Sequence, residues 1–381
     1  MDGSSRSLSV VPEAVIEYFD LGAIRSIEQL RSDSTSAALK LVSESGRWFL
    51  KRHRPGKTFK QLQLEIAIQL RLKATGFLYI ASFKPGLDGE YCLSHDGTFW
   101  SVQDLVDAYS AFDWTDPLGA GGWSREHCFR AGAALAQLHW FGQFCLALQE
   151  NWDLAGSISG SVLGSIPGWF DSALVRAEPV AAGNPSSESV LLHIARSKAP
   201  LAALLGETLA EIEGWNADHQ NPVLLVHGDY HPGNTLFTGS DLRAIIDFDY
   251  AHLESAVYDL GYAAIMFCTR AGGSLTDLQN EDPLLAADLE SQIFNQEFFT
   301  ALIAGYRQSL SRIARGSLGE KISRAVESDL LLNAYARIAC YLILLWALDE
   351  HRLGTGGQLA DAARVTVRAL NTLQWLSTSR C

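Results

Sequence analysis

The stretch at residues 224–250, LLVHGDYHPGNTLFTGSDLRAIIDFDY, decides the fold because polar side chains stand at the ends of its short apolar runs. The first run predicts a strand that leads directly into the loop carrying Asp229. The runs TLF and LRAIID predict two further strands around the turn TGSD. Because a hairpin brings its two ends together, we expect Asn234 and Asp247 to lie side by side, with Asp229 in the adjoining loop.

These two carboxylates and one amide predict an oxygen-rich site for a hard divalent cation. Carboxylate and amide oxygens are the ligands that Mg²⁺ prefers, and the stretch has no cysteine thiolate for a zinc site. Mg²⁺ held by few protein ligands completes its coordination with water and substrate phosphates. The pattern therefore indicates nucleotide chemistry, in which the carboxylate that does not bind the metal orients an attacking hydroxyl group.

The same residues resemble a known family. HGDYHPGN, residues 227–234, resembles the HxDxxxxN catalytic loop of the aminoglycoside phosphotransferase and choline kinase superfamily, and IIDFD, residues 245–249, resembles its metal-binding strand end. The resemblance implies that Asp229 is the catalytic base, that Asn234 and Asp247 are Mg²⁺ ligands, and that ATP is the cosubstrate. Asp249 remains an alternative to Asp247 as a ligand.

The fold that this resemblance implies is α+β, bilobal and protein-kinase-like. The N-terminal lobe, residues 1–112, is expected to be an antiparallel β-sheet with one helix, and residues 113–381 a mainly α-helical lobe that carries the catalytic loop. The residue pattern agrees, since LKLVSESGRWFLK at residues 39–51 predicts a hairpin and residues 58–76 an amphipathic helix. Further strands are expected at YIASFK, residues 79–84, and on both sides of a turn at Asp96-Gly97.

Nucleotide contacts are expected from the N-terminal lobe. The resemblance implies a strand lysine for the phosphates and a helix glutamate that holds it, and Lys51 and Glu65 occupy these positions. Lys40, Lys57 and Lys60 remain alternatives to Lys51. The hinge is expected at residues 103–106, with Gln103 as a nucleotide contact.

The expected phosphate loop, RSDSTSAAL at residues 31–39, contains no glycine. Ser34 and Ser36 are the expected phosphate contacts there, because hydroxyl groups with backbone N–H groups can replace a glycine-rich cradle.

Support for the catalytic loop is expected from two further residues. His227 is expected to brace the loop by hydrogen bonding, and the resemblance implies that Asp259 in YDLG braces it too. His231 could approach the substrate or only stabilise a turn. His139 is expected to be a core or helix-end histidine.

The function that the resemblance implies is ATP-dependent transfer of the γ-phosphoryl group to a hydroxyl of a small molecule. The acceptors of the family include aminoglycosides and other antibiotics, homoserine, amino alcohols and sugars. One alternative is a kinase-fold binding protein without turnover, which the glycine-free phosphate loop favours. A protein kinase is less favoured, because Gly228 stands where protein kinases have an arginine.

Composition excludes other classes of function. The chain has 381 residues and a net charge of −13, and its longest basic run is KRHR at residues 51–54, so we expect no nucleic-acid partner. Six cysteines without metal-type spacing indicate a reducing compartment, and we expect a cytoplasmic monomer or homodimer. The apolar run at residues 338–348 is expected to be a buried helix too short to span a membrane, and residues 156–189 are expected to be surface loops.

Overall fold

The computed structural model describes most of the chain in seven continuous ranges and a few short C-terminal pieces. The described residues are 11–30, 37–53, 56–109, 123–148, 162–181, 198–269, 294–348, 365–366, 368–370, 372–373 and 375–377. The chain divides into two compact units, the first formed by residues 1–108 with 147–157 and the second by residues 109–146 with 158–381. The predicted boundary at residue 112 and most of the linker around it lie outside the described residues.

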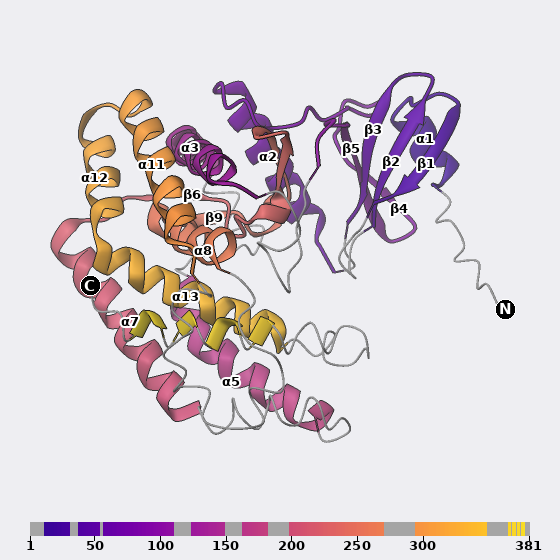
Figure 1. Ribbon diagram of the computed structural model, residues 1–381. Helices are drawn as coiled ribbons and strands as arrows, with labels where there is room; N and C mark the ends of the chain where they lie inside the picture. Colours follow the sequence, from indigo (N-terminus) through magenta and orange to yellow (C-terminus); the bar gives the residue numbers. More distant parts are fainter. Residues whose placement is uncertain are drawn as a thin grey trace. The chain divides into compact units, whose positions relative to one another are not determined.

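A five-stranded antiparallel sheet forms the first unit, with strand order β1-β2-β3-β5-β4 (Figure 1). The strands are β1 (Ile24–Gln29), β2 (Ala37–Ser43), β3 (Arg47–Arg52), β4 (Leu93–His95) and β5 (Thr98–Asp104). Asp96 and Gly97 both have positive φ, 49° and 72°, which is the geometry of a tight two-residue hairpin turn. The predicted sheet and both predicted hairpins are confirmed.

One predicted strand of this unit is wrong. Within residues 79–84 only Phe83 forms a bridge, an isolated one with Gln103. The segment nevertheless lies against β5, because the Lys84 N–H donates to the Val102 carbonyl and the Asp104 N–H to the Ser82 carbonyl. Pro85 follows directly and has no N–H to continue a ladder, so the pairing stops there.

The described residues of the first unit form two helices, whereas the sequence predicted one. Helix α2 (Phe59–Ala74) is the predicted one, and a capping box between Thr58 and Gln61 fixes its start. The additional helix, α1 (Glu13–Tyr18), is short and packs Val15 and the following Phe19 into the core formed by one face of the sheet. Because it has a single turn and a half, its periodicity is too brief to predict a helix.

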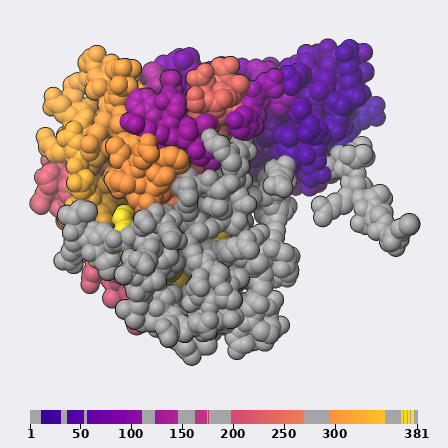
Figure 2. Space-filling model, in the orientation of Figure 1, coloured from indigo at the N-terminus to yellow at the C-terminus, as the bar shows by residue number. Residues whose placement is uncertain are grey.

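Helices dominate the second unit (Figure 1). They are α3 (Arg125–Gly142), η1 (Gln143–Leu148), α5 (Val162–Ala181), α7 (Lys198–His219), α8 (Ala256–Cys268), α11 (Gln296–Ile313), α12 (Gly316–Glu327) and α13 (Asp329–Ala347). Every residue of α8 is buried, which makes it the central helix of this unit. Helices α11 and α12 form part of the surface that Figure 2 shows.

Two short antiparallel ladders accompany these helices. Strand β6 (Val223–Val226) pairs with β9 (His252–Ser255), and β7 (Thr235–Thr238) pairs with β8 (Asp241–Ile245). The second ladder is the predicted hairpin.

The loop prediction for residues 156–189 is wrong for its central part, which is helix α5. Leu163, Ile166, Phe170 and Ala173 are buried at helical spacing, so an apolar stripe stabilises the helix despite its two glycines and two prolines. The predicted loops on both sides of α5 lie outside the described residues.

The apolar run at residues 338–348 is the second half of a longer helix than predicted. Helix α13 has 19 residues, and an 18-residue window of it has a mean hydropathy of 1.7, so by length and composition it could cross a membrane. Its 18-residue apolar window is 72% buried inside the structure, where α13 packs against α8 and α7. This burial is that of a core helix, as predicted, although the whole helix is longer than the predicted run and long enough to cross a membrane.

Helices α3 and α11 approach each other backbone to backbone. A Cβ atom added at Gly132 would lie 2.0 Å from the Leu302 carbonyl oxygen, and one added at Gly305 would lie 2.0 Å from the Phe129 carbonyl oxygen. Each helix therefore needs a glycine at the crossing, because no side chain fits between the two backbones.

Replacing Gly132 with alanine is expected to lower the free energy of unfolding by about 2 kcal/mol, since the methyl group forces the two helices apart. The matched control is Gly206→Ala in α7, where an added Cβ meets nothing within 4 Å. That control should stabilise the chain by about 0.5 to 1 kcal/mol through helix propensity. Denaturant unfolding of both variants checks the prediction, and equal effects of the two substitutions would contradict it.

Candidate active site

The loop after β6 and the β7–β8 hairpin form one continuous structure. The loop passes through a short 3-10 turn, η2 (Pro232–Asn234), directly into β7. Thr235 pairs with Ile245, and the Ile246 N–H donates to the Asn234 carbonyl at 3.0 Å. The hairpin thus brings the chain positions of Asn234 and Asp247 together, as the sequence predicts.

Asp229 lies in this loop with its carboxylate held by three side chains. Its Oδ1 accepts a hydrogen bond from the Tyr262 hydroxyl at 2.8 Å, and its Oδ2 accepts one from Asn234 Nδ2 at 3.1 Å. His231 Nε2 lies 3.3 Å from the same Oδ2. The Gly233 N–H donates to His231 Nδ1, so the ring hydrogen is on Nε2 and faces Asp229.

The carboxylate of Asp229 is ionised at neutral pH. Burial raises its pKa, but the interactions with His231, Tyr262 and His227 outweigh burial and lower it to about 2. The side chain keeps 20% of its surface exposed, so a small molecule can reach it. An ionised, reachable carboxylate can orient a hydroxyl group and take its proton.

Asp259, in the first turn of α8, holds the backbone of the loop. Its Oδ2 accepts from the His227 N–H at 2.6 Å and its Oδ1 from the Gly228 N–H at 2.9 Å. His139 Nε2 of α3 lies 3.1 Å from Oδ2. The carboxylate is fully buried; burial raises its pKa, but the hydrogen bond and charge of His139 and the interactions with His227 outweigh burial and lower it. This is the geometry that a bracing role requires.

Gly228 is needed between these two backbone contacts. Its φ is +82°, and a Cβ added there would lie 2.1 Å from the Tyr250 carbonyl oxygen. A larger residue, such as the arginine of protein kinases, does not fit this backbone.

His227 links the loop to the hairpin. The Asp229 N–H donates to its Nδ1 at 3.3 Å, so its Nε2–H donates to the Ile246 carbonyl at 2.9 Å. Burial lowers the pKa of the imidazole, which keeps it neutral. The ring therefore has both nitrogens engaged in structural hydrogen bonds, as a bracing residue would.

The proposed metal ligands have an arrangement that fits a hard cation. Asn234 Nδ2 donates to both the carbonyl and the carboxylate of Asp229, so the amide oxygen points away from Asp229. Asp247 follows β8 in the left-handed region with φ of 64°, one residue before a short turn, η3 (Phe248–Tyr250). An amide oxygen and a carboxylate at neighbouring strand ends are donors that suit Mg²⁺. Asp249 lies within η3 and remains the alternative.

In the first unit, Glu65 contacts two lysines. The Lys51 ammonium lies 4.0 Å from Glu65 Oε1, whereas Lys57 makes the closer ion pair and hydrogen bond with Oε2. All three side chains are largely buried. The structure thus brings the predicted pair together and adds Lys57, which the sequence left as an alternative to Lys51.

The other predicted nucleotide contacts are only partly described. Gln103 lies near the end of β5, where its side chain donates to Gln69 on α2 at 3.3 Å. Ser34 and Ser36 lie outside the described residues.

Tyr262 and the role of His139 were not predicted from the sequence. Tyr262 follows Asp259 by three positions on α8, so it lies on the same helix face one turn later, a spacing that could have indicated it. His139 is a buried core histidine as expected, yet its ring connects Asp259 to the Tyr306 hydroxyl.

Comparison with known proteins identifies the family. The model of the Phosphotransferase enzyme family matches residues 26–291, which is more than half of the chain and includes every predicted site residue. The chain belongs to this family.

Curated relatives of this phosphotransferase include homoserine kinases. The homoserine kinase of Methylocella silvestris is 24% identical over 262 residues, which is 68% of this chain and 70% of that protein. The homoserine kinase of Pseudomonas aeruginosa is 36% identical over 113 residues, 29% of this chain. That second match spans only 34% of the Pseudomonas protein.

Solved structures similar to the phosphotransferase share its fold. Spectinomycin phosphotransferase, in complex with ADP and spectinomycin, matches with a TM-score of 0.57 at 15% identity over 96% of this chain and 100% of that chain. Ethanolamine kinase from Plasmodium vivax matches with a TM-score of 0.59 at 14% identity. The match covers 95% of this chain and 88% of that chain. An amicoumacin kinase in complex with AMP-PNP and Ca²⁺ matches with a TM-score of 0.54 at 14% identity. The match covers 94% of this chain and 91% of that chain. The predicted protein-kinase-like α+β fold is confirmed.

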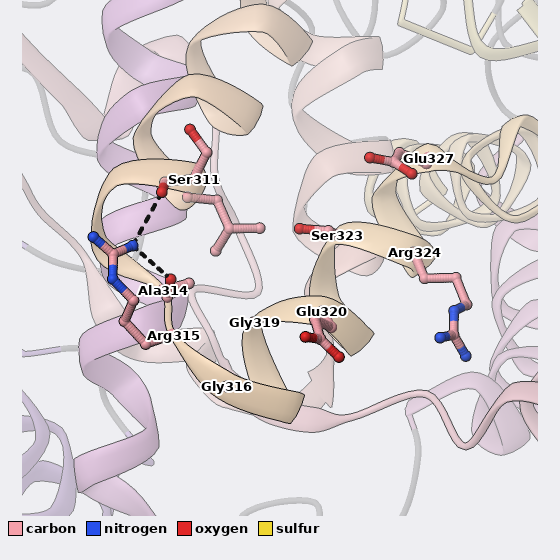
Figure 3. Close-up of a pocket in the computed structure, with 10 residues that line it drawn as sticks. Ser311, Ala314, Arg315, Gly316, Gly319, Glu320, Ser323, Arg324 and Glu327 are labelled. Carbon is pink, nitrogen blue, oxygen red and sulfur yellow. Dashed lines mark hydrogen bonds between the residues drawn. The ribbon is translucent and has the colours of Figure 1, made fainter.

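A hollow of about 460 Å³ lies elsewhere in the phosphotransferase, where α11 meets α12 (Figure 3). Arg315 at its edge donates to the carbonyl oxygens of Ser311 and Ala314. The residues that line it include none of the predicted site residues, so we do not assign it to the active site.

Replacing Asp259 with asparagine is expected to destabilise the phosphotransferase at neutral pH by about 3 kcal/mol. The N–H groups of His227 and Gly228 donate to different carboxylate oxygens, and an asparagine amide has only one oxygen that accepts a hydrogen bond. Because the pKa of Asp259 is lower in the folded state, its ionised carboxylate stabilises the fold at pH values above about 3.9, the ordinary pKa of aspartate. This stabilisation is lost as pH falls through the pKa of Asp259 in the folded state. The difference between wild type and variant should therefore shrink below about pH 4.

Denaturant unfolding at pH 7 and pH 3 measures this difference. Asp218→Asn, which removes an exposed carboxylate on α7, is the control and should have little effect at either pH. A destabilisation by Asp259→Asn that is the same at both pH values would contradict the prediction.

Proposed function

We propose that the chain is an ATP-dependent kinase that phosphorylates a hydroxyl group of a small molecule. The observation that carries this proposal is the Asp229 carboxylate, which is ionised, reachable and held by three donors in a loop whose backbone Asp259 fixes. Phosphoryl transfer needs positioning and charge neutralisation more than covalent catalysis, so a rigidly placed carboxylate beside a cation site suits it.

The reaction follows from this arrangement. The acceptor oxygen forms a bond to the γ-phosphorus while the bond to the β,γ-bridging oxygen breaks, and ADP leaves with that electron pair. Asp229 orients the acceptor hydroxyl and takes its proton. Asn234 and Asp247 would hold Mg²⁺, which supplies charge neutralisation at the β- and γ-phosphates when bound.

The first unit would bind the nucleotide. Lys51 and Lys57 place two ammonium groups around Glu65, and a lysine held by a glutamate is what kinases use at the α- and β-phosphates. Solved relatives in complex with ADP or AMP-PNP support a nucleotide cosubstrate.

The acceptor that we propose to test first is homoserine. The curated relatives are named homoserine kinases, whereas the structural neighbours act on spectinomycin and ethanolamine by their names. All of these molecules carry a hydroxyl group and are small, which agrees with the proposed chemistry.

The five described cysteines are free and buried, which supports the proposal of a cytoplasmic location.

The test is an acceptor screen with the purified protein. Mg²⁺ and ATP are supplied with L-homoserine, ethanolamine, choline, spectinomycin, other aminoglycosides or sugars, and ADP release is followed. Phosphorus NMR of the product then identifies the phosphorylated hydroxyl. We expect at least one acceptor to stimulate ADP release in wild type and not in the Asp229→Asn variant. Nucleotide binding without release for any acceptor would instead indicate a kinase-fold binding protein.

A further inference from the structure

Tyr262 contacts the reacting carboxylate from the helix that also fixes the loop backbone. Its hydroxyl donates to Asp229 Oδ1 at 2.8 Å, while Asp259 on the same helix accepts from the backbone of the catalytic loop. The Tyr262 ring is 7% exposed and lies in the second unit with all of these partners. Helix α8 therefore sets both the path of the loop and the orientation of its carboxylate.

The hydrogen bonds of Asp229 are distributed unequally over its two oxygens. Oδ2 faces two donors, Asn234 Nδ2 and His231 Nε2, whereas Oδ1 accepts from Tyr262 alone among the described residues. An ionised carboxylate has about four acceptor positions, about two on each oxygen. These three donors therefore leave Oδ1 with the position that an acceptor hydroxyl can use.

We propose that Tyr262 is a positioning residue that fixes Asp229 so that Oδ1 receives the proton of the acceptor hydroxyl. This inference rests on the proposed kinase function. The acceptor O–H bond breaks as its oxygen bonds to the γ-phosphorus, and the proton moves to Oδ1. Because Tyr262 donates to the same oxygen, it stops the carboxylate from rotating about its side-chain bonds and keeps Oδ1 directed at the acceptor.

Tyr258 provides a matched control one turn earlier on α8. Its ring is also buried and packs edge-on against His252 and Tyr335. Among the described residues its hydroxyl is not a hydrogen-bond partner of Asp229. Tyr258→Phe therefore removes a hydroxyl from the same helix and leaves the hydrogen bonds of Asp229 in place.

Tyr262→Phe is expected to lower kcat about tenfold, since a hydrogen bond to a charged group is lost while the ring packing remains. The rate is measured both with the best acceptor of the screen and with Mg²⁺ and ATP alone, where water is the acceptor. The KM for ATP and the midpoint of thermal unfolding should not change, and Tyr258→Phe should match wild type in all of these measurements.

A double-mutant cycle with Asp229→Asn separates positioning of the base from a general structural role. If Tyr262 acts through Asp229, adding Tyr262→Phe to Asp229→Asn should not lower the residual rate further. Multiplied losses in the double variant, unchanged kcat in Tyr262→Phe, an equal loss in Tyr258→Phe, or an unfolded Tyr262→Phe protein would each overturn the proposal. Absence of transfer by wild type to any acceptor or to water would overturn the kinase function itself, and this inference with it.

Discussion

Replacing Asp229 with asparagine is expected to lower kcat about a thousandfold and to leave the Kd for the Mg²⁺ complex of ATP unchanged. The amide has the same shape as the carboxylate but cannot take the proton of the acceptor hydroxyl. The pKa of about 2 means that wild type has the ionised form throughout the neutral range, so the whole population loses its base on substitution. Steady-state kinetics and calorimetric nucleotide titration measure the two quantities.

The control for this prediction is Asp241→Asn at the start of β8. Asp241 is an exposed carboxylate on the same hairpin, so its substitution removes the same charge without touching the loop. We expect wild-type kinetics from it. A variant of Asp229 with more than about a tenth of wild-type kcat would contradict the role of general base, because such a base contributes at least about a hundredfold.

The parts of the site that the sequence predicted are close together in the chain. Asp229, Asn234 and Asp247 lie within nineteen consecutive residues, and a hairpin with its turn residues is a local feature that periodicity indicates. The same holds for the β2–β3 hairpin that carries Lys51. In both places the geometry follows from the pairing of strands that are adjacent in the chain, so the local sequence is sufficient to predict it.

The parts that were missed depend on tertiary packing. Tyr262 is 33 positions from Asp229, and His139 is 120 positions from Asp259. These contacts exist because α3 and α8 pack beside the loop. The periodicity of a sequence predicts the buried face of a helix, but it does not predict which residues of another element contact that face. Lys57 illustrates the same limit, since spacing alone could not decide which lysine approaches Glu65 more closely.

Asp247→Asn is expected to abolish turnover, with kcat lowered by at least about a thousandfold, because a bound metal contributes several kcal/mol of charge stabilisation at the phosphates. The substitution should not strain the backbone, since asparagine tolerates the left-handed φ of 64° as well as aspartate does. A loss of fold therefore would not explain the loss of rate. The measurement is kcat as a function of Mg²⁺ concentration, together with thermal unfolding.

Asp249→Asn decides between the two acidic residues of this segment. Asp247 lies two residues after Ile245, the last residue of β8, which pairs with Thr235 next to Asn234, whereas Asp249 lies two residues further along in η3. A ligand beside Asn234 must come from the strand end, so Asp249→Asn should keep a wild-type requirement for Mg²⁺ and most of the activity. If Asp249→Asn abolished turnover while Asp247→Asn did not, the metal would be held from the 3-10 turn, and the hairpin would position only Asn234.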